Sequence, residues 1–506
     1  MSLAAAIRAT PGIPCRPWPR HMLPPERWTA LGAEPALALL AMWGDTHAVH
    51  ALLRDAAGML AVSVTVADGR YPALSPQRPG AFLFERAIRD LWGHAAEGAT
   101  DQRPWLDHGR WDITTPLAAR PPARIGAAPP VSFLNSDDTL DQVPTGPLAG
   151  GITAAGQFRL FTRGPTIARM EARLGYLHKG IPALMRGKSP RAASRFASRL
   201  AGDAPVAHSI AFARAAEAAS DIAPPPRALA LRAVMAELER IASHLADLDA
   251  LAQAGSTPLA ATPCQLHREA ILRAADRGFG HRLMMDIVVP GGLSVDLAPE
   301  SQDILRTTVT ALGRDLPAIA RLCQDLAQRL QGIAVAPPAA VAALSPGGPA
   351  GRASGADSDL RRTPGYAPYH DLNVSPVREH AGDAAARMLV LLAELRDSAR
   401  MLRTLLAELP TGEIVAALPQ ASGEGFGWAE GPRGDVWTWL RLDGGQISSV
   451  FLRDPGWLIL PLMEAAMAGP NLPGPNLSGP NSLGTDLSEW AVARASFGLS
   501  HAGMDL

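Results

Sequence analysis

The longest helical pattern in the chain begins directly after the prolines of 224–226 and continues through residues 227–254 to a stop at Gly255. Aliphatic side chains repeat along it at helical spacing and give a stripe that faces a core: Val234, Leu238, Ile241, Leu245 and Leu248. Glu237 and His244 lie at the edge of this stripe, where buried polar groups need partners. We favour hydrogen bonding between core helices for both residues, with catalysis as the alternative.

Composition limits the class of protein. At 506 residues the chain is too long for one core, so two or three domains are expected. The formal net charge of −1 gives no basic surface of the kind that binds nucleic acid. No run of about 18 apolar residues occurs, so we expect no direct membrane span. Cys15, Cys264 and Cys323 lack pair spacing, which argues against disulfides and against a zinc or iron-sulfur site.

The first part of the chain predicts a small mixed domain. Residues 1–22 are rich in Pro and Arg and are predicted to form a mobile arm. Residues 24–57 are predicted to be helical because 36–43 is a continuous apolar run. The alternating, β-branched residues 59–66 predict a strand that ends at a turn. A stretch rich in Pro and Ala then places a linker at 123–143.

The remainder predicts a small sheet followed by helices. Residues 158–162 and 167–173 alternate on either side of a Gly-Pro turn, which is typical of a β-hairpin. From residue 181 the pattern is mostly helical, with further amphipathic helices expected at 263–285, 299–331 and 383–409. Residues 469–484 contain a short Gly-Pro-Asn-Leu repeat with the composition of a flexible loop.

Five short motifs follow one another in the second part of the chain: Gly175–Gly180, Arg199–Ser209, Glu237–Leu245, Gly351–Arg362 and Glu430–Gly434. In this order they resemble the large catalytic subunit of nickel-iron hydrogenases, chiefly the membrane-bound formate-hydrogenlyase type (group 4), and the D subunit (49 kDa type) of respiratory complex I. The order of the motifs is more specific than any one of them.

The resemblance implies that the thiolate ligands of the nickel are missing. Hydrogenases hold the metal with two Cys-x-x-Cys pairs, whose positions fall here on Ala201, Ala204, Ser500 and Gly503. The tyrosine and histidine that contact quinone in complex I fall on Gly202 and Ala149. Because nickel needs soft ligands, we interpret the chain as a relative that kept the scaffold and lost the metal. This interpretation requires Arg199, Arg433 and the C-terminal segment to converge on one cavity.

A second resemblance concerns the N-terminal part. Residues 84–93 and His108 resemble the end of the C subunit of complex I, although a solvated helix face with Glu85, Arg86 and Arg89 explains the same residues. The domains expected are therefore one like the C subunit at 23–122 and one like the D subunit at 144–506. The fold class implied is α+β: a small N-terminal α/β domain, then a small antiparallel sheet with a large helix bundle of the hydrogenase large subunit type.

The leading hypothesis is a peripheral subunit of a complex I-like or formate-hydrogenlyase-like membrane oxidoreductase. It is not expected to be a nickel-iron hydrogenase itself, and no Gly-x-Gly-x-x-Gly loop for NAD is visible. The family fold implies a cleft between sheet and helix bundle. Six polar residues are candidates to line this cleft and to relay protons or orient a quinone: His178, Asp203, His208, Arg352, Asp359 and Arg433.

The resemblance also implies partners and cofactors. The partners are a small iron-sulfur subunit like the B subunit of complex I, a ferredoxin-like subunit, and membrane proteins like the H subunit and like antiporters, on the cytoplasmic side of the cell membrane. An iron-sulfur cluster would lie in a partner, quinone is a candidate ligand, and we expect this chain to bind no cofactor or metal of its own. The alternative is a non-catalytic scaffold or coupling subunit, which the emptied ligand positions favour. A free-standing soluble enzyme is disfavoured because no catalytic triad, phosphate loop or cofactor fingerprint stands out.

Overall fold

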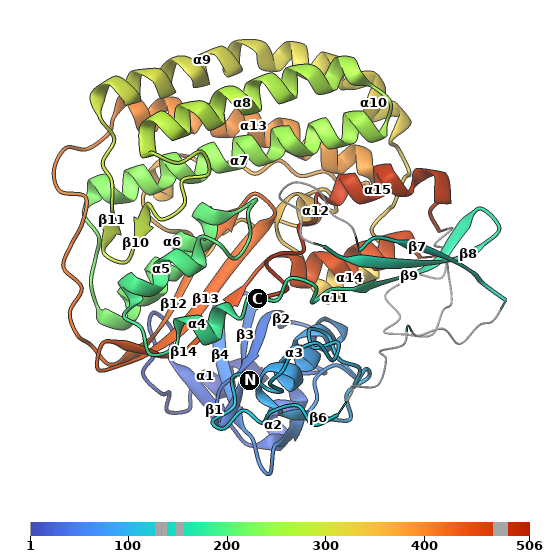
Figure 1. Ribbon diagram of the computed structural model, residues 1–506, viewed down its shortest axis with the longest axis vertical. Helices are drawn as coiled ribbons and strands as arrows, with labels where there is room; N and C mark the ends of the chain where they lie inside the picture. The colour runs from blue at the N-terminus through green and yellow to red at the C-terminus, as the bar shows by residue number, and fades with distance from the viewer. Residues whose placement is uncertain (1, 127–132, 134–138, 148–154, 469–483) are drawn as a thin grey trace.

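The computed structural model describes residues 2–126, 133, 139–147, 155–468 and 484–506. A layer of long helices lies on one side of the molecule, the N-terminal domain lies on the other, and sheet strands and short helices lie between them (Figure 1). Most of the predicted linker, Ala149 and most of the 469–484 repeat lie outside the described residues. The prediction of a small N-terminal domain before a sheet and a large helix bundle is confirmed.

The N-terminal domain is built on a mixed sheet. Its strands, in spatial order, are β1 (Arg20–Leu23), β4 (Gly58–Thr65), β3 (Ala48–Asp55) and β2 (Ala38–Gly44). The β1–β4 pair is parallel and the other pairs are antiparallel. A smaller parallel pair and three helices complete the domain: β5 (Arg70–Pro72), β6 (Ala95–Glu97), α1 (Leu3–Arg8), α2 (Pro25–Ala30) and α3 (Phe82–Trp92).

Two predictions for this domain were wrong. The apolar run 36–43, predicted to be helical, forms most of β2, whose residues are buried almost throughout. A short apolar run buried on both faces has the same pattern in a strand as in a helix. The N-terminal arm, predicted to be mobile, contains α1 and β1, with Ile7 and Cys15 buried. Trp18 in this arm packs on Trp428, with ring centroids 4.9 Å apart.

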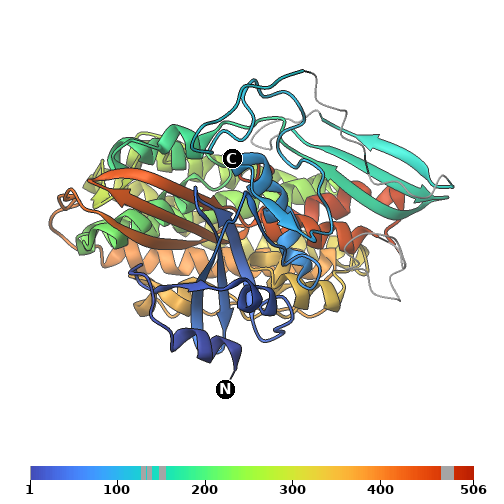
Figure 2. The same cartoon turned by 90° about the horizontal axis from the view of Figure 1, so that it is seen from below.

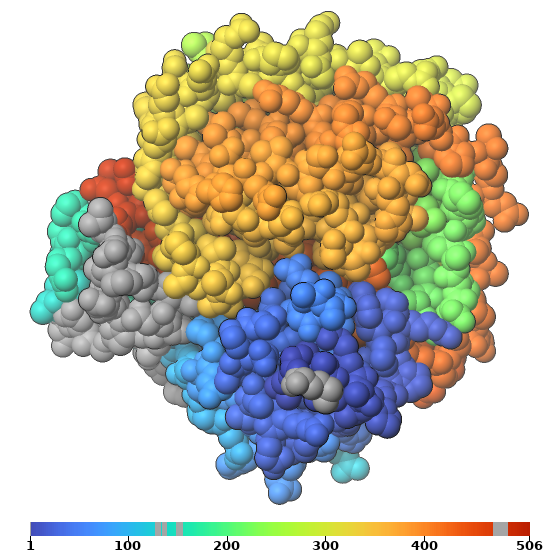
Figure 3. Space-filling view, turned by 180° about the vertical axis from the view of Figure 1, so that it is seen from behind, coloured from blue at the N-terminus to red at the C-terminus, as the bar shows by residue number. Residues whose placement is uncertain are grey.

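The N-terminal domain is fastened to the rest of the chain by ion pairs and packing. Arg20 pairs with Glu424 at 2.8 Å, and Arg441 pairs with Asp45 at 2.9 Å. Figure 2 shows the N-terminal sheet packed below the sheet of the C-terminal part. From behind, the N-terminal domain forms a continuous surface with the helical part (Figure 3).

The two further sheets are antiparallel. One contains β7 (Asp141–Thr145), β8 (Gln157–Arg163) and β9 (Thr166–Arg173), so the predicted hairpin is confirmed. The other contains β12 (Gly423–Gly431), β13 (Gly434–Asp443) and β14 (Gln446–Arg453). Helix α6 (Pro205–Ser220) lies directly on β12, which is possible because Gly425 and Gly427 have no Cβ to overlap its carbonyl oxygens.

The helix bundle is organised around α7 (Pro226–Ala254), the helix predicted from the proline run. Its predicted stripe is buried. The other long helices are α8 (Pro258–Phe279), α9 (Pro299–Leu322) and α13 (Ala384–Ala407). Shorter helices and strands are α4 (Ile181–Met185), α5 (Pro190–Ala197), β10 (Val288–Val289), β11 (Gly292–Leu293), α10 (Gln324–Arg329), α11 (Pro338–Leu344), α12 (Gly348–Arg352), α14 (Gly456–Met467) and α15 (Trp490–Phe497). Within the described ranges, no helix has the length and hydropathy needed to cross a bilayer.

Candidate functional site

A cavity of about 450 Å³ lies between α7 and α8. It exists because the facing surfaces of the two helices carry small side chains that do not fill the space: Ala242, Ser243, Ala246 and Ala275. Its apolar wall is formed by larger buried residues, chiefly Leu238, Ile271 and Leu272. A cavity of this size is in the range, about 300–1,000 Å³, that small-molecule sites occupy.

One end of the cavity is polar and is built from segments far apart in the sequence. The loop before α6 supplies Asp203, the turn between β12 and β13 supplies Arg433, and the segment after α15 supplies Ser500. Gly498 ends α15 in the left-handed conformation, and a Cβ at this position would overlap Arg433. The glycine therefore allows the arginine to enter the site.

Arg433 is held between two carboxylates. Its Nε donates to Asp203 at 3.3 Å, and its guanidinium forms a close ion pair with Asp247 on α7. Burial would lower the pKa of Arg433, but Asp247 and Asp203 raise it above its ordinary value. Burial raises the pKa of Asp247 even though Arg433 acts in the opposite direction. The arrangement fixes a permanent cation next to the cavity with its charge largely compensated.

Several polar atoms around the cavity lack partners. Within the part of the chain that the structure describes, no hydrogen bond reaches Asp203 Oδ1, Ser243 Oγ, Ser500 Oγ or Arg268 Nε. Ser243 and Ser500 are only 7% and 6% exposed. Buried polar groups in native proteins are nearly always paired with protein or ordered water. These four atoms belong to residues that line the cavity, and they have no partner within the described part of the protein.

Glu239 adds an ionisable group to the wall of the cavity. Its carboxyl oxygens accept hydrogen bonds from the amides of Val206 (2.6 Å) and Ala207 (3.0 Å) at the start of α6. Burial raises the pKa of Glu239 to about 8, despite these two amides. At neutral pH the side chain is therefore largely protonated and can supply a proton to the cavity.

The positions assigned to the nickel ligands do not form a metal site. Ala201 is fully buried against Ala502, and neither side chain has a donor atom. A Cβ at Gly503 would overlap the carboxylate of Asp454. Among the described residues, no group of three or more His, Cys, Asp or Glu side chains is arranged to hold a metal ion. The residues present therefore do not fit a nickel-iron centre.

The cavity contains two of the six candidate residues predicted from the sequence, Asp203 and Arg433. His208 is fully buried, and its Nε2 contacts Asp454 at 3.0 Å. His178 contacts the backbone carbonyl of Asp505 at 2.6 Å through Nδ1 and packs on Trp111. Neither histidine lines the cavity.

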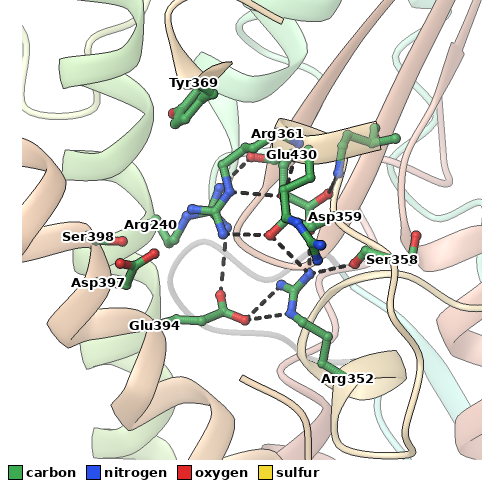
Figure 4. A network of polar contacts seen from close by, with 12 residues as sticks. Arg240, Arg352, Ser358, Asp359, Arg361, Tyr369, Glu394, Asp397, Ser398 and Glu430 are labelled. Atoms are coloured by element: carbon green, nitrogen blue, oxygen red, sulfur yellow. Dashed lines mark hydrogen bonds and ion pairs between the residues drawn. The ribbon is translucent and has the colours of Figure 1, made fainter. Parts of the chain in front are cut away.

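Arg352 and Asp359 belong instead to a buried ion network between α7, α12 and α13 (Figure 4). Arg352 donates to Glu394 at 2.8 Å and to Glu430 at 2.9 Å. Asp359 is bound through both oxygens by Arg361, at 2.7 and 3.0 Å. Burial would raise the pKa of Asp359, but Arg361 and Arg352 lower it to about 2. These side chains already have partners within the protein.

Glu237 and His244 also join this network, as the sequence indicated. Glu237 accepts hydrogen bonds from Tyr369 (2.7 Å) and Ser398 (2.6 Å). His244 Nε2 contacts Glu394 at 2.8 Å. The interpretation of both residues as hydrogen-bonding partners between core helices is confirmed.

Sequence reasoning missed the other polar residues of the cavity. Glu239 and Ser243 lie four residues apart in the motif that was examined for Glu237 and His244. The spacing places them on one face of α7, toward α8, and this was the signal available. Arg268 lies outside the motifs and carried no such signal. The expectation that Arg199, Arg433 and the C-terminal segment converge on one cavity was wrong for Arg199, which pairs with Asp286 near the surface. Arg433 and Ser500 do line the same cavity.

Comparisons with known proteins agree with this architecture. Residues 179–252 match the family model described as nickel-dependent hydrogenase, and residues 260–422 match the respiratory-chain NADH dehydrogenase 49 Kd subunit. The D subunit of NADH-quinone oxidoreductase from Dehalococcoides mccartyi (strain 195) is 32% identical over 302 residues, which cover 57% of this chain and 81% of the relative. The chain belongs to the family of complex I 49 kDa-type subunits and nickel-iron hydrogenase large subunits.

Two further comparisons extend the match within this family. Formate hydrogenlyase subunit 5 of Escherichia coli K12 is 29% identical over 402 residues, which cover 76% of this chain and 70% of the relative. A chain of the membrane-bound sulfane sulfur reductase (MBS), an archaeal respiratory membrane complex, has the same fold, with a TM-score of 0.65 and 21% identity. That match covers 74% of this chain and all of the other. These relatives are subunits of complex I-like and hydrogenase-like oxidoreductase complexes.

Proposed function

We propose that this chain is a subunit of a membrane-associated, complex I-like oxidoreductase in which the cavity between α7 and α8 receives the small molecule that the complex oxidises or reduces. The site works without a nickel-iron centre. The observation that carries the proposal is the set of unpartnered polar atoms around an apolar-walled cavity, at the place where Asp203, Arg433 and Ser500 meet. Such a cavity is the default binding site of a protein.

The residues of the cavity fit proton-coupled electron transfer. Full reduction of a quinone to a quinol takes up two electrons and two protons, and Glu239 carries a proton at neutral pH. Arg433 lines the same end of the cavity, where Asp203 and Asp247 fix the position of its guanidinium beside a bound molecule. A quinone is one candidate for this molecule, because its carbonyl oxygens can accept hydrogen bonds from Ser243 and Ser500.

The proposal includes the setting of the complex. Electrons would come from an iron-sulfur cluster in a small partner protein, itself supplied by a ferredoxin-like protein. Membrane proteins like the complex I H subunit and like antiporters would anchor the assembly, with this chain peripheral on the cytoplasmic side. The relatives, which are subunits of multi-subunit complexes, support this arrangement.

The test is a comparison of Asp203→Ala and Arg433→Ala with Arg199→Ala, which removes an ion pair near the surface. Each variant is introduced into the complex in its own membranes. Oxidation of reduced methyl viologen, with decylubiquinone added as the electron acceptor, is measured relative to a gene-deletion strain. We expect the two cavity variants to assemble and to lose about tenfold or more of the rate, as loss of a charged hydrogen bond predicts. Full activity in both assembled variants would refute a role for the cavity.

A second candidate function is a non-catalytic scaffold or coupling subunit. It is favoured by the close packing of Ala201 on Ala502 and by the partners that Arg352 and Asp359 already have inside the protein. In this case the deletion strain lacks the assembled complex, while the cavity variants restore both assembly and activity.

A further inference from the structure

Arg268 lies at the wall of the cavity and has no partner among the residues that the structure describes. It lies on α8 and is partly buried, and its Nε is inaccessible to solvent. Two neighbouring arginines have an acidic partner: Arg273 and Arg282 share Glu269, at 2.7 and 2.6 Å. Within the described ranges, no hydrogen bond or ion pair reaches the guanidinium of Arg268.

The acids around the cavity do not neutralise Arg268. Asp249, which also lines the cavity, accepts a hydrogen bond from Gln265 at 2.9 Å. Asp203 pairs with Arg433, and Glu239 is bound by the α6 amides. Arg268 therefore lines the cavity as a cation that no carboxylate of the described residues pairs with, and an anion in the cavity would compensate its charge.

Apolar surface continues directly from this charge. Ile271, Leu272 and Ala275 follow Arg268 at helical spacing on the face of α8 that lines the cavity. On the facing helix, Leu238 and Ala242 complete an apolar wall. The apolar part of a molecule that fills the cavity would therefore lie against this wall, with the guanidinium of Arg268 at its edge.

We infer that the cavity binds a small organic carboxylate, whose charged group pairs with Arg268 and whose apolar body lies against α7 and α8. This inference rests on the proposed function, since it names the class of molecule that the cavity receives. The planar guanidinium matches the two oxygens of a carboxylate. A hydroxyl on the ligand would find an acceptor in the free Oδ1 of Asp203.

The experiment measures binding by isothermal titration to the purified full-length chain. The probes are benzoate, 4-hydroxybenzoate and 3-phenylpropanoate, each compared with its neutral amide, and decylubiquinone as a neutral redox molecule. We expect at least one acid to bind at least about tenfold more tightly than its amide, the effect of one charge-assisted hydrogen bond. Arg268→Gln should abolish this preference, Arg268→Lys should restore part of it, and the control Arg273→Gln should leave it unchanged.

The inference is overturned if no acid exceeds its amide, if decylubiquinone alone binds, or if Arg268→Gln retains the preference. Failure here and failure of the proposed function can be separated. If the acids do not bind but Asp203→Ala abolishes turnover of the complex, the function stands and the ligand class is wrong. If the acids bind through Arg268 but turnover survives in Asp203→Ala, the carboxylate site is confirmed and the proposed role of the cavity in the reaction is wrong.

Discussion

Glu239 should make the stability of this protein depend on pH in a defined direction. Burial raises the pKa of this carboxyl from an ordinary value of 4.5 to about 8. A carboxyl whose pKa is raised by folding stabilises the folded state below pH 4.5, and this contribution is lost as the pH rises to 8. Each pH unit in this window is worth about 1.4 kcal/mol. The loss between pH 5 and pH 8 is therefore up to about 4 kcal/mol.

The perturbation that isolates this effect is Glu239→Gln, because glutamine does not ionise. Unfolding by urea is measured for both proteins at pH 5, 6, 7 and 8. Glutamine alters the hydrogen bonds from the Val206 and Ala207 amides equally at every pH. The informative quantity is therefore how the difference in unfolding free energy between variant and wild type changes with pH. We expect the unfolding free energy of the variant to rise steadily relative to that of the wild type from pH 5 to pH 8. Glu300→Gln, at an exposed acid, is the control.

A constant difference between Glu239→Gln and wild type across this range would show that the carboxyl is ionised throughout. The proposal that Glu239 carries a proton for the cavity would then be wrong. If the α6 amides outweighed burial, the pKa of Glu239 would lie below 4.5, and the difference in stability would stay flat above pH 5 and change only at lower pH.

Two other predictions concern the buried polar groups. Arg352→Met should cost about 3–5 kcal/mol in the free energy of unfolding, because it leaves Glu430 buried without its ion pair and removes the nearest guanidinium from Glu394. The exposed Arg273→Ala should cost less than about 1 kcal/mol, and equal losses for the two variants would contradict the network's role. Gly503→Ala should destabilise by about 1–3 kcal/mol, because its Cβ meets the Asp454 carboxylate that contacts His208. An unchanged melting temperature for this variant would show that the segment at Gly503 can move away from Asp454 at little cost.

Much of the fold could be predicted from the sequence because its long helices have strong local signals. The proline run and the aliphatic stripe locate α7 to within a residue of its observed bounds. The β8–β9 hairpin is similarly marked by alternation around a Gly-Pro turn. The run at 36–43 was assigned wrongly because its burial comes from sheet pairing and from packing on both faces, which periodicity does not reveal.

The site was less predictable because it depends on which residues remain without partners. Asp203 and Arg433 could be found from motifs, and they meet at the cavity. Arg352 and Asp359 belong to equally clear motifs, yet Glu430 and Arg361 already bind them. The cavity itself arises from small residues on two helices, such as Ala242 and Ala275, which look like ordinary core positions in the sequence.

The central claim is that this chain offers a small molecule a cavity at Asp203, Arg433 and Ser500 and works without a nickel-iron centre. The most direct test is the nickel content of the active complex. Cells are grown with nickel, the complex is purified from their membranes, and its nickel is measured by elemental mass spectrometry. We predict electron transfer with far less than one nickel per chain, because Ala201 and Ala204 supply no ligand and Gly503 is closed by Asp454. One nickel per chain, lost together with activity on chelation, would contradict the account.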